Sequence, residues 1–113
     1  MPFDAEITTE NRDKIILQKA RDLLVEKGWC KNKVINGKGQ MCSLGALNMA
    51  NHGDPNHFNR YNDYKTRLAD WDRLLGFEED KRGDGFAVAD WNNAQTSIEP
   101  ILARFDAAIA KLS

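Results

Sequence analysis

The sequence predicts a mainly α fold: a compact bundle of about four helices, with either a short β-hairpin or an irregular loop at residues 33–41. Two long segments repeat apolar residues at three- and four-residue spacing, which is the period of one helix face. Glycines follow three of the predicted helices, where helices commonly end. The length of 113 residues suits one domain, which we divide into an N-terminal arm at 1–10 and a single helical domain at 11–113.

The first predicted helix covers residues 11–27. Thr9 or Asn11 can cap its start, and Gly28 stands where a left-handed C-terminal residue is common. Its apolar face consists of Ile15, Ile16, Ala20, Leu23 and Leu24. This spacing predicts a helix that packs one side against a core.

A basic segment follows at residues 29–41. The dipeptide Asn36-Gly37 is a strong tight-turn sequence, so the residues on either side could pair as a hairpin. An irregular loop is the alternative, because an isolated two-stranded ribbon is only marginally stable.

The second predicted helix is short and covers residues 44–50. Ser43 or Cys42 opens it, and Gly53 stops it. Three small residues lie inside this helix: Gly45, Ala46 and Ala50. We expect them to allow close backbone packing against a neighbouring segment.

The middle of the chain predicts a further helix at residues 63–75, which ends at Gly76. Residues 78–85 are charged and contain glycine, which is typical of an exposed loop. The apolar patch at residues 86–91 fits either one helical turn or a brief strand.

The last predicted helix begins with a capping-box sequence, Thr96-Ser97-Ile98-Glu99. Pro100 falls in its first turn, where a missing N–H costs little. Its apolar stripe consists of Ile98, Ile101, Leu102, Phe105, Ala108, Ile109 and Leu112. The first and last helices therefore supply the longest core faces.

Composition excludes several classes of protein. The chain has 16 Lys and Arg residues against 17 Asp and Glu residues, and a formal charge of −1 disfavours a generic nucleic-acid binder. Two cysteines cannot form a disulfide scaffold in a chain of this length. No apolar run approaches the roughly 20 residues of a membrane span, and the start lacks the order of a signal peptide. We therefore predict a cytoplasmic protein with no membrane contact and no cofactor.

Cys42 is the residue that most suggests chemistry. A thiol at a helix N-terminus has a lowered pKa, and His52 and His57 are the only imidazoles that could act as its base. The alternative, which we favour, is that Cys42 packs as a small apolar side chain. With Cys30 these residues also have the right types for zinc, but they lack the short Cys-x-x-Cys spacing, so no metal site is predicted.

Charged residues suggest two surfaces. A phosphate or a single-stranded nucleic acid could contact the lysines at Lys31, Lys33 and Lys38, although a solvated loop is the commoner role. An acidic stretch could instead contact a protein partner. Its carboxylates are Asp70, Asp72, Glu78, Glu79 and Asp80.

A ligand pocket is a third candidate. It would lie among five residues: Trp29, Cys42, Trp91, Asn92 and Asn93. Tryptophan rings could form its walls and the two amides could bind a ligand. The amides could equally bond backbone groups where the last helix begins, and we favour that structural role.

Three short motifs resemble those of a known family. They are Gly28-Trp29-Cys30, then the run from Cys42 to Leu47, then Trp91-Asn92-Asn93 with Thr96. Together they resemble a family of small uncharacterised domains from actinobacteria and bacteriophages, in which an aspartate follows Trp-Asn where this chain has Asn93. The resemblance implies a bacterial or phage origin and supports the fold boundaries, and it carries no established activity.

These observations favour a non-enzymatic binding protein. We expect it to be encoded by a phage or mobile element and to contact a host protein, for example as an inhibitor of a bacterial defence complex. One alternative is a small enzyme or ligand binder that uses Cys42 with His52 or His57. Phosphate or nucleic-acid contact through the lysines of residues 31–38 is the other.

Overall fold

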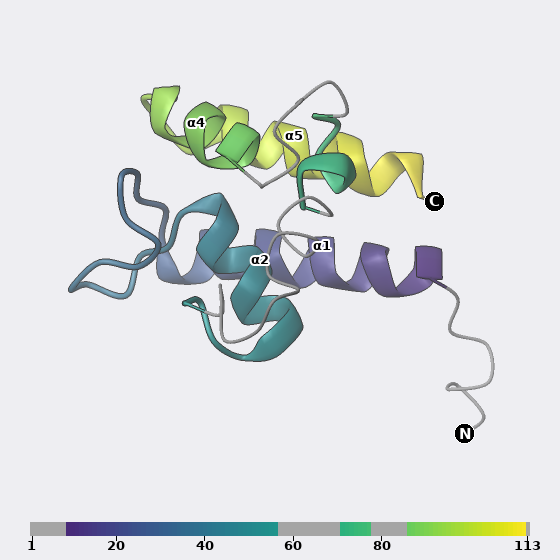
Figure 1. Ribbon diagram of the computed structural model, residues 1–113, viewed down its shortest axis with the longest axis horizontal. Coiled ribbons are helices and arrows are strands. Elements are labelled where there is room, and N and C mark those ends of the chain that lie inside the picture. The colour runs from purple at the N-terminus through teal and green to yellow at the C-terminus, as the bar shows by residue number, and fades with distance from the viewer. Residues whose placement is uncertain (1–8, 57–70, 78–85, 113) are drawn as a thin grey trace.

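The computed structural model describes residues 9–56, 71–77 and 86–112 (Figure 1). The named helices are α1 (Thr9–Lys27), α2 (Ser43–His52), α4 (Phe86–Ala94) and α5 (Glu99–Lys111). Residues 71–74 are also helical. The predicted mainly α fold is therefore confirmed. None of the described helices is long and apolar enough to cross a membrane.

Helices α1 and α5 both run along the long axis of the molecule and pack against each other (Figure 1). Helix α2 contacts α1 on one side and α4 on the other. The fully buried large side chains at the centre come from these elements: Leu17 and Leu24 of α1, Leu47 of α2, Val88 of α4, and Ile101 and Phe105 of α5. The apolar faces predicted for the first and last helices thus build the core.

The segment before α2 is a loop with two isolated bridges and no hairpin ladder. Met41 pairs with Trp29 in a parallel bridge and with Ile35 in an antiparallel bridge. The side-chain oxygen of Asn36 accepts hydrogen bonds from the backbone N–H groups of Lys38 and Gln40, at 2.9 and 3.0 Å. Within residues 33–41 the strand-like pairing is therefore limited to the single bridge between Ile35 and Met41.

Helix α2 begins and ends as its sequence predicts. Cys42 is the N-cap residue, and Gly53 closes the helix in a left-handed conformation with a φ of 73°. The expected close packing occurs at Gly45, where an added Cβ would lie 2.3 Å from the carbonyl oxygen of Val34. The backbone N–H of Cys42 also donates to that carbonyl, at 3.1 Å. A glycine is therefore needed where α2 meets the preceding loop.

The later helices differ in detail from their predictions. The 86–91 patch is helical, and its helix continues to Ala94. The predicted capping box is wrong, because α5 begins at Glu99 after an N-cap residue, Ile98, that has helical backbone angles and no side-chain cap. Ile98 packs against the core, so apolar contact fixes the start of α5 in place of a hydroxyl cap. Pro100 does lie in the first turn.

The middle helix is described only at its end. Residues 71–74 are helical, and Gly76 follows with a φ of 88°, as expected for a left-handed stop. The first part of that predicted helix, most of the N-terminal arm and the predicted 78–85 loop lie outside the described residues.

Candidate functional site

Asn92 joins three segments at the junction of α2 and α4. Its side chain is fully buried, and its Oδ1 accepts hydrogen bonds from Trp29 Nε1 at 2.8 Å, Ser43 Oγ at 2.7 Å and Ser43 N at 3.0 Å. Its Nδ2 donates to the carbonyl oxygen of Cys30 and to Asn93 Oδ1, both at 3.2 Å. Protein groups therefore use the donors and the acceptor of this amide.

The neighbouring amide completes the same network. Asn93 Oδ1 accepts the backbone N–H of Asn32 at 2.7 Å, and Asn32 has a positive φ of 68° that few non-glycine residues adopt. Of the residues predicted to bind a ligand, the structure therefore brings Trp29, Asn92 and Asn93 together. Their hydrogen bonds join the loop at residues 29–32 and the start of α2, whereas the sequence-based alternative placed their backbone partners where the last helix begins.

The thiol of Cys42 lies inside the molecule. Its side chain is only 6% exposed, and its Sγ accepts the backbone N–H of Gly45 at 3.4 Å. Burial raises the pKa of Cys42, and the hydrogen bonds from backbone N–H groups offset this only in part. A helix N-terminus taken alone predicts a lowered pKa for this thiol, and desolvation outweighs that effect here.

The Cys–His pair is not assembled by the described residues. Cys42 precedes the first residue of α2, whereas His52 is its last residue, about 15 Å away along the axis. His52 Nε2 lies 3.1 Å from Asn51 Nδ2. His57 lies outside the described residues. Among the described side chains, no group of three or more His, Cys, Asp and Glu residues could hold a metal ion.

The other cysteine is half-buried in the loop. Cys30 Sγ donates to the carbonyl oxygens of Lys33 at 3.4 Å and Gln40 at 3.3 Å. Burial raises the pKa of Cys30, and the nearby charge of Lys33 lowers it by less. Both described thiols are therefore more weakly acidic than an ordinary cysteine.

The predicted charged surfaces are only partly described. Lys31 Nζ donates to the carbonyl oxygen of Gln95 at 3.2 Å, just after α4, while Lys33 and Lys38 are exposed in the loop. Asp72 is 3% exposed, and its Oδ1 accepts the backbone N–H of Val88 in the first turn of α4 at 3.2 Å. This carboxylate therefore makes a hydrogen bond inside the protein and is not exposed for contact with a partner. The other predicted acids, Asp70, Glu78, Glu79 and Asp80, lie outside the described residues.

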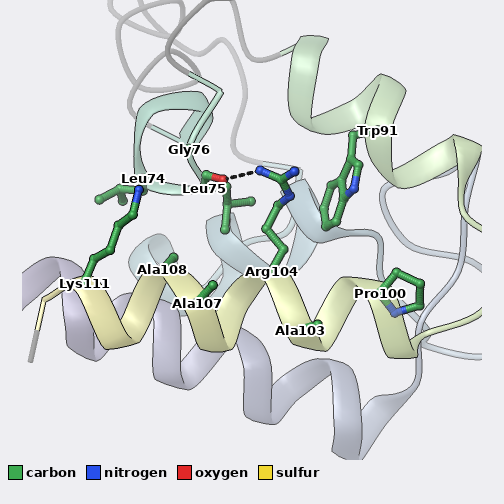
Figure 2. A pocket seen from close by; sticks show the side chains of 10 residues that line it. All are labelled: Leu74, Leu75, Gly76, Trp91, Pro100, Ala103, Arg104, Ala107, Ala108 and Lys111. Carbon is green, nitrogen blue, oxygen red and sulfur yellow. Dashed lines mark hydrogen bonds between the residues drawn. The ribbon is translucent and has the colours of Figure 1, made fainter.

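A groove of about 550 Å³ runs along the outer face of α5 (Figure 2). One wall is formed by Leu74, Leu75 and Gly76, and Trp91 of α4 lines the groove further along. Its lining residues on α5 are Pro100, Ala103, Arg104, Ala107, Ala108 and Lys111. Small side chains on the helix leave this space open between α5 and the 74–76 segment.

Arg104 is held at the middle of the groove. Its Nη1 donates to the carbonyl oxygen of Leu75 at 2.7 Å. Its guanidinium carbon lies 4.2 Å from the ring centre of Phe77 and 5.1 Å from that of Trp91. The two rings contact each other with centres 5.6 Å apart. These cation–π contacts and the hydrogen bond fix the position of a positive charge in the groove.

Lys111 places a second positive charge on the same face of α5, seven residues after Arg104. No carboxylate is found among the described residues that line the groove. Sequence reasoning missed this site, because it followed the apolar stripe of the last helix, which shares only Ala108 with the described lining of the groove. The available signal was the spacing of Arg104, Ala107 and Lys111, which repeats at three and four residues.

The comparison with known families gives one match. The chain belongs to a family of unknown function, DUF6197, whose model matches residues 8–111. No curated protein and no solved structure matches the chain. The family match covers the groove and the Asn92 network.

Proposed function

We propose that this protein is a non-catalytic binding protein that contacts a partner protein through the groove along α5. The observation that carries the proposal is the groove itself, which combines about 550 Å³ of open space with Arg104, Lys111 and the aromatic ring of Trp91. Aromatic and arginine side chains are the residues on which protein interfaces most depend. An aromatic wall beside two cations suits a partner segment that has both apolar and acidic side chains.

The geometry around Cys42 supports binding over thiol chemistry. A nucleophilic cysteine needs an accessible thiolate and a base within hydrogen-bond distance. In this protein burial raises the pKa of Cys42, and His52 lies at the other end of α2. The groove, in contrast, opens to solvent.

The biological setting of the proposal rests on the sequence. The motifs from Gly28 to Thr96 resemble domains of actinobacteria and bacteriophages, so we place the protein in a host cytoplasm as a phage or mobile-element product. Its partner is then a host protein, and inhibition of a bacterial defence complex is one form that the contact would take.

Site-directed crosslinking tests this function. A photoreactive phenylalanine analogue replaces Ala107, an exposed residue in the groove, or Gln18, an exposed control on α1. We expect irradiation in the bacterial host to join position 107, and not position 18, to a defined host protein. Adding Lys111→Glu should abolish that product. Equal products from both positions, or none from position 107, would contradict the proposal.

A further inference from the structure

The groove has two unlike halves, and Arg104 separates them (Figure 2). Arg104 and Lys111 both rise from α5 toward the 74–76 segment, with Ala107 and Ala108 between them. On the other side of Arg104 the groove is lined by Trp91, Pro100 and Ala103. One half is therefore cationic and the other half is aromatic.

The cationic half suits one carboxylate. Arg104 and Lys111 are two helical turns apart, about 10.5 Å along the axis, and their long side chains flank a floor of alanines. The carbonyl oxygen of Leu75 accepts from one nitrogen of Arg104, which has five N–H donors. A carboxylate seated between the two cations meets positive charge on both sides and no acid from the described lining residues.

The aromatic half suits a flat or apolar side chain. Trp91 is half-buried, and Ala103 and Pro100 are small enough to leave room against its ring. A side chain placed there would contact the part of the Trp91 ring that lines the groove, beside the Arg104 guanidinium and the Phe77 ring that already contact this indole. Aromatic pairs of this kind gain more than the burial of their area alone.

The length of the groove suits a short extended segment. From Pro100 to Lys111 the groove is about 16 Å long, which is the length of about five residues of an extended chain. The side chains of such a chain point to the same face at every second residue, so two of them can enter the groove.

Resting on the proposed function, we infer that the groove binds an extended partner segment in which an acidic residue and an aromatic residue are two positions apart. The centre of the cationic half, at Ala107 and Ala108, is about 7 Å along α5 from Ala103 in the aromatic half. Two residues of an extended chain span about 6.6 Å on one face. The acidic side chain then lies between Arg104 and Lys111, and the aromatic side chain lies on Trp91.

Blocked, fluorescein-labelled peptides test this inference with the full chain. The probe has Glu-Gly-Phe between glycines, and its controls have adjacent Glu-Phe or have Gln in place of Glu. We expect fluorescence anisotropy to show about threefold to tenfold tighter binding of the Glu-Gly-Phe peptide at low salt than of either control. Equal affinity for all three peptides, or no binding of the probe at millimolar protein, would overturn the inference.

Protein variants test whether the acidic side chain of the peptide binds at the groove. Lys111→Gln should weaken binding of the Glu peptide about threefold to tenfold and leave the Gln peptide unchanged. Lys38→Gln removes an equally exposed lysine from the loop and should change neither. Circular dichroism confirms that both variants fold. An equal loss in the two variants would show general attraction to the protein and would also overturn the inference.

The two proposals fail separately. If the peptides do not bind but crosslinking from position 107 still captures a host protein, the groove contacts a partner by other chemistry. In that case the binding function stands and the acidic–aromatic segment is wrong. If crosslinking also fails, neither proposal stands.

Discussion

At the scale of single residues, the amide of Asn92 shows how one side chain can hold a junction together. The sequence places two amides before the last helix and leaves open whether they bind a ligand or the backbone. The structure shows Asn92 bonded to the loop, to the start of α2 and to the ring of Trp29. Its side chain therefore joins α4 to the loop and to the start of α2 by hydrogen bonds.

Replacing this amide should be costly. Asn92→Ala leaves the half-buried N–H of Trp29 and the buried backbone N–H of Ser43 without this acceptor, and a fully buried group left so costs about 1–3 kcal/mol. Only the Ser43 N–H is fully buried and the indole N–H of Trp29 is half-buried, so we expect the free energy of unfolding to fall by about 2–3 kcal/mol in urea denaturation followed by circular dichroism. Asn93→Ala removes an acceptor from a less buried site and should cost about 1 kcal/mol. Equal losses would argue against a special role for Asn92.

The residue scale also shows where sequence rules conflict. The helix N-terminus at Cys42 predicts a lowered thiol pKa, whereas burial predicts a raised one. The spacing along the chain locates the N-cap but does not reveal that the side chain is 6% exposed. Only the packing of α2 against other segments decides which effect is larger.

At the scale of elements, the close approach of α2 to the loop depends on Gly45. Alanine usually favours a helix over glycine by about 1 kcal/mol, so Gly45→Ala would stabilise an isolated α2. Here the new Cβ would lie 2.3 Å from the carbonyl oxygen of Val34, so the backbone must move. We expect a net loss of about 2–3 kcal/mol in the free energy of unfolding. A control variant in exposed helix, Gln18→Ala, should change it by less than about 0.5 kcal/mol. A stabilised Gly45→Ala protein would contradict this packing.

Periodicity predicted the elements with long apolar stripes and left the short ones open. Helices α1 and α5 agree with their predicted positions because many apolar residues repeat on one face. The 86–91 patch has too few residues to distinguish a helix from a strand by spacing. The capping-box prediction failed because burial of Ile98 determines where α5 begins, and local sequence does not encode that contact.

At the scale of the whole molecule, the free energy of unfolding should change with pH in the alkaline range, because the two thiols lose their protons there. Burial raises the pKa of both Cys42 and Cys30, so the folded state keeps these protons to a higher pH than the unfolded chain. The contribution is complete below the pKa of an unfolded thiol, near 8.5, and is lost as pH rises toward the folded pKa. The free energy of unfolding should therefore fall between about pH 8 and pH 10.

Cysteine variants isolate this effect from other titrations. Cys42→Ser should reduce the slope of unfolding free energy against pH over that range, whatever its effect at pH 7. Urea denaturation at several pH values gives the slope. An unchanged slope in Cys42→Ser and in Cys30→Ser would show that neither thiol has a raised pKa in the folded state.

The spacing on α5 indicates one wall of the groove, but the groove itself forms only when separate segments pack together. Leu75, Trp91 and Arg104 come from three separate segments, and none of them is unusual in its local sequence. The sequence instead directed attention to the rare residue types Cys, His and Trp. Among the described residues of these types, Trp91 alone lines the groove.

The ion pair between Arg21 and Asp106 bears on how the molecule is made. These side chains join α1 to α5 across 85 residues of chain. A ribosome releases α1 and then α2, which packs against α1, well before it releases α5. The part of α1 that packs against α5 therefore stays uncovered during synthesis until α5 has emerged.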